Sequence, residues 1–458
     1  MAKYKAYPEY KDSGVELLGE VPLTWRVFKL KFGLSEPLVY GANEAALDDN
    51  PDNPRYIRIT DMNPDGTLRN DTFKSLPKVI SEPYMLIDGD ILLARSGATV
   101  GKSFYYKSIF GPSCFAGYLI RARFNSDKII PRLAYWFFQS SIYWQYVSGS
   151  QIQATIQNVS AEKYSDLYLS APLEYAEQAL VADFLDHETA KIDNLIEKQQ
   201  QLIELLKEKC QAVISHAVTK GLNPDVPMKD SGVEWLGDVP EHWIIKRLKH
   251  ISPKVGVGLV INPSTYTKDE GVYFIFGGDV KEFGFDLTKT RRISTQDSNK
   301  LLPSRLNSRD LVSVRVGYPG ITAVVTDDLE GSNCASIIII RRGSYNSDWL
   351  CAAMNVWVGR QQVDLASYGA AQKQFNVSDA IEFVFPVPSI NEQNDIADFV
   401  QKTLNKFDDL TQKALKQIEF LQERRTALIS AAVTGKIDVR DWVAPDKQDV
   451  EESQEATA

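Results

Sequence analysis

The chain has 458 residues, 44% of them hydrophobic and 24% charged, with a formal net charge of −9. This length exceeds what one hydrophobic core usually serves, and the composition is that of a soluble globular protein, so we expect two to four domains. The four cysteines and four histidines are scattered without a CxxC pair, which argues against a metal site and favours reduced thiols. No apolar run reaches the length of a membrane span and no signal peptide is apparent, so we expect a cytoplasmic protein without a membrane partner.

The negative charge is concentrated in particular segments of the chain. Residues 1–170 carry 19 Lys and Arg against 18 Asp and Glu, and residues 229–387 carry 18 against 18. The acidic excess lies in the segments between and after these two near-neutral blocks. A neutral domain can still present a basic face, so the charge neither supports nor excludes a nucleic-acid partner.

The first block has the pattern of a mixed α/β domain. It follows a head motif, KDSGVELLGEVPLTW (Lys11–Trp25), whose tryptophan we expect in the core. The stretches RYIRITDM, DGDILLARSG and CFAGYLIRARF alternate as strands do. The stretch PRLAYWFFQSSIYWQYVSG (Pro131–Gly149) is typical of an aromatic helix entered at a proline.

Within this block, ARSGATVGKSFYY (Ala94–Tyr106) ends its glycine-rich part in Gly-Lys-Ser, like a phosphate-binding loop. Such a loop has four residues between its glycines and leads into a helix. Here Gly97 and Gly101 are separated by three residues, and an aromatic, strand-like run follows. The pattern favours a strand, a glycine turn and a second strand over a nucleotide site.

The segment after the first block, and the end of the chain, predict two long helices with matching apolar seams. Spacing near 3.5 residues with charged residues between is typical of a coiled coil, most simply antiparallel. The alternative is that each helix packs on its own domain. The expected pairing positions are Ile192, Leu195, Leu202, Leu206 and Val213 in the first helix, widened by Ile196, Ile203 and Cys210, and Phe407, Leu410, Ala414, Ile418, Leu421 and Leu428 in the second.

The second half of the chain repeats the first. KDSGVEWLGDVPEHW (Lys229–Trp243) matches the first head at eleven of fifteen positions. RDLVSVRVG aligns Arg315 with Arg95, EQNDIADFVQKTLNKFD repeats EQALVADFLDHETAKID, and ALISAAVTGK repeats AVISHAVTKG. The blocks between these motifs differ more. An internal repeat of one scaffold with two different surfaces indicates a molecule that recognises two different things.

These heads, the EQNDIADFV helix opening and the AVTKG and AVTGK helix ends resemble the specificity subunit of type I restriction–modification enzymes, over about residues 7–442. The resemblance implies an α+β chain with two mixed α/β target-recognition domains separated by two long helices in an antiparallel coiled coil, related by a pseudo-twofold internal repeat. The expected domains are 1–171 and 227–387 for recognition, 172–226 and 388–442 for the helices, and an acidic, disordered tail at 443–458.

The resemblance also implies a function and a set of partners. Each recognition domain would read one half of an asymmetric, interrupted site in double-stranded DNA. The helices would dock two methyltransferase subunits, and translocase–endonuclease subunits would join the assembly. S-adenosylmethionine, ATP and magnesium would belong to those partners. The chain has no NPPY-like methyltransferase motif and no catalytic constellation, so we expect a non-catalytic subunit.

Arg95 and Arg315, each near a glycine turn, are the foremost candidates for base contacts, because an arginine fork pairs with guanine O6 and N7. Structural ion pairs are their alternative. The Gln-rich stretches Ser148–Ser160 and Ala366–Ser378 occupy equivalent places and could contact DNA or serve as connectors. The full candidate set is Arg58, Arg95, Ser96, Gly97, Lys102, Gln153, Arg291, Arg292, Arg315, Gly317, Tyr318, Lys373 and Gln374.

Two other functions remain open from the residues alone. A nucleotide-dependent enzyme built on GATVGKS would bind ATP through Lys102. A coiled-coil adaptor with protein-binding heads would show no salt-sensitive affinity for duplex DNA.

Overall fold

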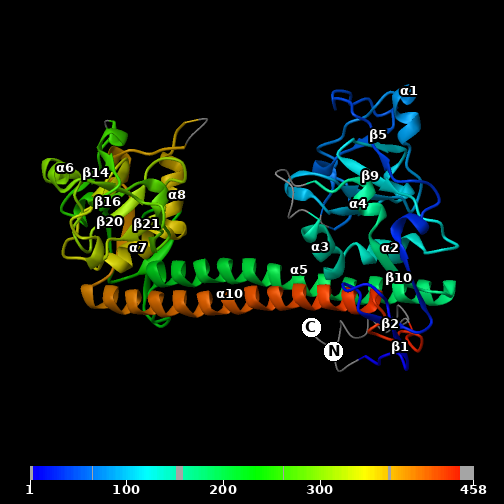
Figure 1. The fold of residues 1–458 in the computed structure, drawn as a ribbon. Coiled ribbons are helices and arrows are strands. Elements are labelled where there is room, and N and C mark those ends of the chain that lie inside the picture. Colours follow the sequence, from blue (N-terminus) through cyan, green and yellow to red (C-terminus); the bar gives the residue numbers. More distant parts are fainter. Residues whose placement is uncertain (1–3, 64, 151–157, 261, 370–372, 444–458) are drawn as a thin grey trace. The chain divides into compact units, whose positions relative to one another are not determined.

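The computed structural model describes residues 4–63, 65–150, 158–260, 262–369 and 373–443. Contacts between residues divide the chain into two compact units. The first unit comprises Met1–Gln199 with Lys416–Ala458, and the second comprises Gln200–Leu415. Each unit contains one α/β block and a section of both long helices, α5 (Tyr175–Lys220) and α10 (Ile390–Val433) (Figure 1). In the described part of the chain, no helix is both long and apolar enough to cross a membrane.

Each head motif forms a small antiparallel hairpin that packs on its own unit. The pairs are β1 (Tyr10–Asp12) with β2 (Glu20–Pro22), and β11 (Met228–Asp230) with β12 (Asp238–Pro240). Trp25 and Trp243, which follow them, are fully buried, as expected. Their indole N–H groups donate to Glu177 at 2.9 Å and to Glu392 at 3.3 Å, in the first turns of α5 and α10. The two copies therefore use equivalent carboxylates to fix their heads to a long helix.

The first block is built on a four-stranded antiparallel sheet in the order β4-β9-β6-β7. Its central strands β6 (Ile91–Ala94) and β9 (Leu119–Ala122) are buried at every position, which explains their nearly continuous apolar sequence. The other strands are β4 (Val39–Tyr40) and β7 (Ser103–Tyr105), a parallel pair β5 (Arg55–Ile57) and β8 (Ser113–Phe115), and an antiparallel pair β3 (Trp25–Lys29) and β10 (Tyr168–Pro172).

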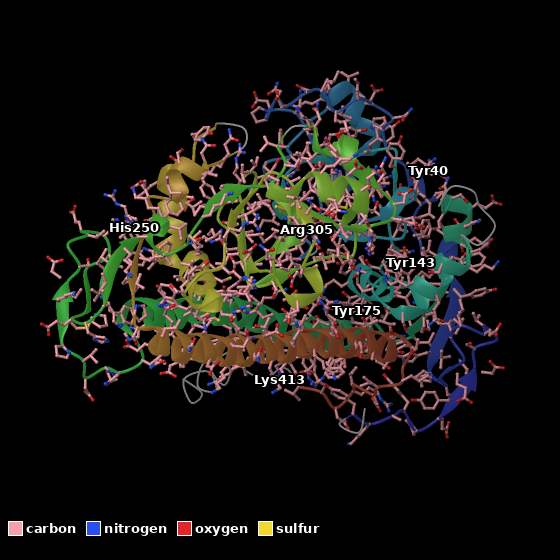
Figure 2. All side chains as sticks on the ribbon, turned by 90° about the vertical axis from the view of Figure 1, so that its left-hand side faces the viewer. Tyr40, Tyr143, Tyr175, His250, Arg305 and Lys413 are labelled. Carbon is pink, nitrogen blue, oxygen red and sulfur yellow. The ribbon has the colours of Figure 1, made fainter. Side chains whose placement is uncertain are left out.

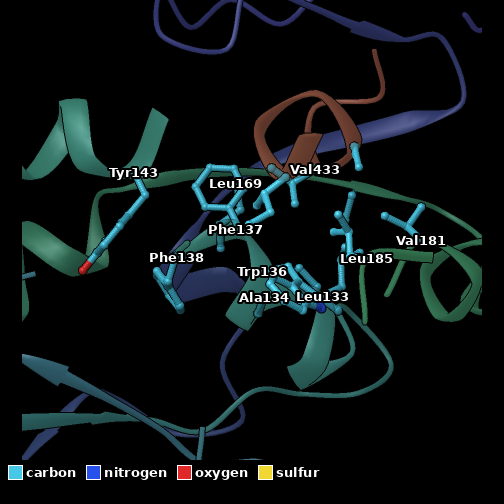
Figure 3. Packing of buried hydrophobic residues seen from close by; sticks show 14 of the residues in the cluster. Leu133, Ala134, Trp136, Phe137, Phe138, Tyr143, Leu169, Val181, Leu185 and Val433 are labelled. Carbon is cyan, nitrogen blue, oxygen red and sulfur yellow. The ribbon is translucent and has the colours of Figure 1, made fainter. Parts of the chain in front are cut away.

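The helices of this block are α1 (Lys78–Ser81), α2 (Pro131–Phe137), α3 (Ser141–Gly149) and α4 (Ala161–Ser165). The single helix expected over Pro131–Gly149 is thus two helices. The break occurs because the Ser140 side chain caps α3, accepting the Tyr143 N–H. Tyr143 is fully buried (Figures 2 and 3) and joins Phe137, Phe138 and Leu169 in the core of the first unit.

The second block repeats this plan with the sheet order β14-β23-β20-β21. The aligned strands are β14 (Val255–Val257), β23 (Ile337–Ile340), β20 (Leu311–Val314) and β21 (Thr322–Val324), with β13 (Ile244–Arg247) and β24 (Val384–Val387) in place of β3 and β10. A second four-stranded sheet contains β15 (Thr267–Lys268), β19 (Arg291–Ile293), β16 (Val272–Ile275) and β22 (Asn333–Cys334), and β17 (Val280–Lys281) pairs with β18 (Gly284–Phe285).

The helices of the second block are α6 (Thr295–Lys300), α7 (Ser347–Asn355), α8 (Trp357–Ala366) and α9 (Val377–Ala380). The helical segment around WLCAAMNVWVG is interrupted at Val356, whose backbone is extended. The repeat therefore includes this break as well, because both blocks divide their aromatic helical segment into two.

The helices α5 and α10 pack against each other in antiparallel fashion, as predicted. In the first unit, Asp193 of α5 accepts a hydrogen bond from Arg425 of α10 at 2.8 Å, and Ile192 shares a core with Leu421 and Leu428. In the second unit, Cys210 and Leu404 lie against one common core. Since residue numbers rise along α5 as they fall along α10, the two directions are opposed.

The seam of the pair corrects three of the predicted positions. Leu195 is 46% exposed, Leu202 is 42% exposed and Leu410 is 37% exposed. The buried or half-buried seam of α5 instead follows alternating steps of four and three residues, at Ile192, Ile196, Gln199, Ile203, Leu206, Cys210 and Val213. Leu195 and Leu202 precede seam residues by one position, which places them about 100° around the helix. In α10, Phe407, Ala414, Ile418, Leu421 and Leu428 are buried or half-buried, with Thr411 in place of Leu410.

The first unit is completed by both ends of the chain. The end of α10 contacts the first block through the Ser170 hydroxyl, which donates to the Val433 carbonyl at 2.9 Å. The segment after α10 then reaches the N-terminal residues. The Tyr10 hydroxyl donates to the Gly435 carbonyl at 2.9 Å, and the Asp438 N–H donates to the Lys5 carbonyl at 2.9 Å.

Candidate nucleic-acid interface

The segment Ala94–Tyr106 is the turn of a β-hairpin. Strands β6 and β7 pair antiparallel through Ile91, Leu92 and Leu93, and the Gly101 N–H donates to the Ala94 carbonyl at 2.9 Å. Gly97 and Gly101 have positive φ angles of 77° and 86°, which only glycine adopts without strain. A strand follows Gly101 where a phosphate-binding loop requires a helix. The geometry does not favour the nucleotide-enzyme alternative.

Arg95 stands directly after β6 in this hairpin and is held by its backbone. Its N–H donates to the Tyr118 carbonyl at 3.0 Å, and its carbonyl accepts the Val159 N–H at 2.8 Å. Its guanidinium carbon lies 4.8 Å from the centre of the Tyr40 ring, a cation–π contact that orients the fork. Within the described residues, Arg95 forms no ion pair, and its buried Nε has no hydrogen-bond acceptor.

Arg315 has an equivalent position in the second block, directly after β20. Its carbonyl accepts the Phe375 N–H at 3.3 Å, and its Nη2 lies 3.5 Å from Gln374 Oε1. Its Nε is also buried without an acceptor among the described residues. The structural ion pairs considered for both arginines are therefore not seen in the part of the chain that the structure describes.

The structure brings five predicted residues of the second block together. Gly317, with φ at 92°, donates its N–H to the Lys373 carbonyl at 3.1 Å, and residues 316 and 374 form an isolated bridge. Tyr318 next to this turn is 82% exposed. In the first block, Ser96 bridges to Asn158 in the same way. The described end of each glutamine-rich connector, at Asn158 and at Lys373–Gln374, thus lies beside its arginine turn. We call the surface formed by Arg95, Ser96, Gly97 and Lys102 the first arginine turn, and that formed by Arg315, Gly317, Tyr318, Lys373 and Gln374 the second.

Three other predicted arginines have their hydrogen-bond and ring partners, among the described residues, outside these turns. Arg58 donates to the buried Asp61 from Nε at 3.0 Å and from Nη2 at 2.8 Å, and also to the Thr72 carbonyl at 2.6 Å. These bonds favour a structural role for Arg58, and its contact with bases stays a prediction. Arg291 and Arg292 are consecutive in β19, so they point to opposite faces. They stack on Phe276 at 4.8 Å and on Tyr273 at 4.2 Å. Gln153 lies outside the described residues.

Sequence reasoning missed two aromatic residues beside the first arginine turn. The Tyr40 ring contacts the Arg95 guanidinium. Tyr118, 64% exposed, accepts the Arg95 N–H through its backbone carbonyl. Tyr118 also borders a pocket of about 530 Å³ with Tyr56, Arg58 and Ala116. No repeat or motif marks these tyrosines, because their role depends on strands β4 and β9 pairing side by side.

The cysteines do not form a reactive site. Cys114, Cys334 and Cys351 are buried free thiols, and burial raises their pKa, to about 12 for Cys114. A thiol is nucleophilic as its thiolate, so these three are unreactive near neutral pH. No group of three or more potential metal ligands lies together among the described residues. The absence of a metal remains a prediction.

No protein-family model matches the chain. In sequence it is 22% identical over 423 residues to the type I restriction enzyme EcoBI specificity subunit of Escherichia coli, covering 88% of this chain and 84% of that one. It is 26% identical over 432 residues to the putative type I restriction enzyme MjaX specificity subunit of Methanocaldococcus jannaschii, covering 92% of this chain and 96% of that one.

The fold gives the same result. A solved chain from a study of complex assembly and conformational transition of the type I R-M system superposes with a TM-score of 0.69 at 14% identity, covering 91% of this chain and 99% of that one. The HsdS subunit from Thermoanaerobacter tengcongensis superposes with a TM-score of 0.51 at 13% identity, covering 91% of this chain and 98% of that one. The resemblance seen in the motifs is thereby confirmed, and this chain is a homologue of the specificity subunits of type I restriction enzymes.

Proposed function

We propose that the chain is the DNA-binding specificity subunit of a type I restriction–modification enzyme, with each α/β block reading one half of an asymmetric, bipartite site. The observation that carries this assignment is the repeated arginine turn. Arg95 and Arg315 follow equivalent strands, are held through their backbones, and have no ion pair among the described residues. An arginine kept in this way is pre-organised to pair with guanine.

The two turns differ in the groups around the arginine, which supports two different half-sites. The first turn adds the Ser96 hydroxyl and the exposed Lys102, which suits phosphate contacts. The second turn adds the Gln374 amide and the exposed Tyr318. A glutamine amide can pair with adenine N6 and N7. The same scaffold therefore presents different hydrogen-bonding patterns in its two copies.

The helix pair carries a repeated apolar surface that fits two equivalent protein partners. The motifs of α5 align with those of α10 at a constant offset from residue 177 with 392 to residue 221 with 436. In this alignment Leu195 matches Leu410, and Leu205, 61% exposed, matches Phe420, 52% exposed. Exposed large apolar residues in repeated places indicate surfaces that a partner covers. Two methyltransferase subunits are the partners we propose for them.

The assembly would also include translocase–endonuclease subunits and act in the cytoplasm. S-adenosylmethionine, ATP and magnesium would be bound by the partner subunits, and this chain would contribute recognition without catalysis. The names of its relatives, all subunits of restriction enzymes, support this division.

The test is a comparison of DNA methylation across the host genome with and without the gene. We expect one interrupted, asymmetric motif to lose its methylation on deletion. Replacing residues 26–170 with the corresponding block of a relative should change only one half of that motif. A change in both halves together, or no loss of methylation on deletion, would contradict the assignment.

A further inference from the structure

The ends of the two long helices are aligned by the repeat, but their surroundings differ. In the first unit, Phe184 of α5 is 1% exposed. Two aromatic rings from outside the helices cover it edge-on, Tyr4 at 5.4 Å and Trp442 at 5.6 Å between ring centres. Ile437, just after α10, is 5% exposed in the same core. The N-terminal segment and the segment after α10 together fill this place.

The aligned place in the second unit is open. Phe399 of α10, which matches Phe184, is 37% exposed, and Leu222, which matches Ile437, is 44% exposed. Between them lies a groove of about 660 Å³, lined also by Val213, His216 and Pro224. We call it the Phe399 groove. The chain runs directly from the end of α5 into the second head, and among the described residues no tyrosine or tryptophan lines the groove where Tyr4 and Trp442 stand in the first unit.

The charges at the two places differ in a way that indicates the occupant. In the first unit, the Tyr4 hydroxyl donates to Glu188 at 2.8 Å. Burial, together with this carboxylate, raises the pKa of Tyr4 to about 12, and the nearby Arg424 opposes the shift. In the second unit, Lys209 matches Arg424, while a threonine, Thr403, matches Glu188. The cation at the groove is thus retained and the carboxylate is not.

We propose that the Phe399 groove is a docking site for a segment of a partner protein that presents a tyrosine or tryptophan ring beside a carboxylate. The ring would lie on Phe399, Leu222 and Val213, as Tyr4 and Trp442 lie on Phe184. The carboxylate would face Lys209 and His216, the polar side chains that line the groove in the part of the chain that the structure describes. The inference is independent of the DNA-binding role, because none of these residues belongs to an arginine turn.

The experiment uses the full chain and a defined probe, the peptide of residues 436–442, KIDVRDW. This peptide carries Trp442, which fills the aligned place, next to the carboxylate of Asp441. We expect saturable binding by fluorescence anisotropy. Ala212→Trp, which fills the groove, should weaken binding about tenfold or more. Ala427→Trp, at the aligned exposed position in the other unit, should leave binding unchanged.

Charge and specificity are tested with matched peptides. The Trp442→Ala peptide should not bind. The Asp441→Asn peptide should bind the wild-type chain more weakly than the unmodified peptide does, and the two peptides should bind the Lys209→Gln chain equally. Equal binding to Ala212→Trp and wild type, or no saturable binding at millimolar peptide, would overturn the proposal. Self-association of the chain that Ala212→Trp abolishes would also overturn it, by identifying a second copy as the occupant. DNA binding by Ala212→Trp, measured alongside, tests the proposed function separately.

Discussion

Replacing Arg95 with alanine isolates the contribution of one arginine turn. The side chain forms no ion pair among the described residues, and its main internal contact is the Tyr40 ring at 4.8 Å. That contact contributes ~0.5–1 kcal/mol to folding, so the variant should remain folded. A lost arginine–guanine pair costs ~1–3 kcal/mol of binding, which is about a 5- to 150-fold loss of affinity.

The assay is anisotropy with the assembled enzyme on three duplexes, one with both half-sites intact and two with one half-site scrambled. Arg95→Ala should lose affinity for the intact duplex and lose little more when the half-site read by the first block is scrambled. Its preference for the other half-site should be unchanged. If Arg95→Ala loses the same affinity relative to wild type on the intact duplex and on the duplex scrambled in that half-site, then Arg95 contacts phosphates and reads no base.

Arg58→Ala is the matched control, because Arg58 is bonded to a carboxylate that is 1% exposed. Removing the partner of a buried charge should cost ~3 kcal/mol of stability. We expect a lower unfolding midpoint with the ranking of DNA sequences preserved. A change in that ranking would show that Arg58 contacts bases.

Three further predictions concern the seam, the glycine turn and the N-terminus. Ile203→Ala should destabilise the chain by ~2–3 kcal/mol in urea unfolding, and Leu202→Ala by less than about 1 kcal/mol, because Ile203 faces the partner helix and Leu202 does not. Similar losses of stability in the two variants would refute the corrected seam. The isolated chain should show no heat of ATP binding that Lys102→Ala abolishes, since a hairpin turn cannot cradle phosphates. The pKa of Tyr4 is about 12 in the folded chain, above the ~10 of an exposed tyrosine, so the stability that its burial contributes should be present below about pH 10 and be lost as pH rises through about 12. Unfolding midpoints of Tyr4→Phe should change less over that interval, and an unchanged pH profile would contradict the burial of this hydroxyl.

The repeat was readable from the sequence because the features that carry it are short and local. The head motifs share both glycines and the final tryptophan, and both blocks place an arginine near a glycine after a buried strand. Those patterns predicted equivalent turns, and the structure shows matching backbone bonds at Arg95 and Arg315. The helix ends were predictable for the same reason, since their apolar positions recur with constant spacing.

The structural features that the sequence did not predict depend on contacts between residues that are distant in the chain. Leu195 and Ile196 are equally apolar, and only the position of α10 decides which one enters the seam. The sequence does not distinguish Arg58 from Arg95, whereas in the structure the Arg58 guanidinium donates two hydrogen bonds to the buried Asp61. Tyr40 gained its role when β4 paired with β9. In each case residues of similar chemistry have different structural roles, and tertiary contacts determine which role each one has.

The closure of the first unit by both chain ends has a consequence for biosynthesis. Residues 200–415 are contiguous, so a ribosome releases everything the second unit needs before it finishes translation. The earlier-made N-terminal half must wait for residues 416–443, which supply Val433, Gly435 and Asp438 to its contacts. The unit whose translation begins first is therefore completed last. A ribosome that stalls just after residue 415 would leave a nascent chain with a complete second unit and an incomplete first unit.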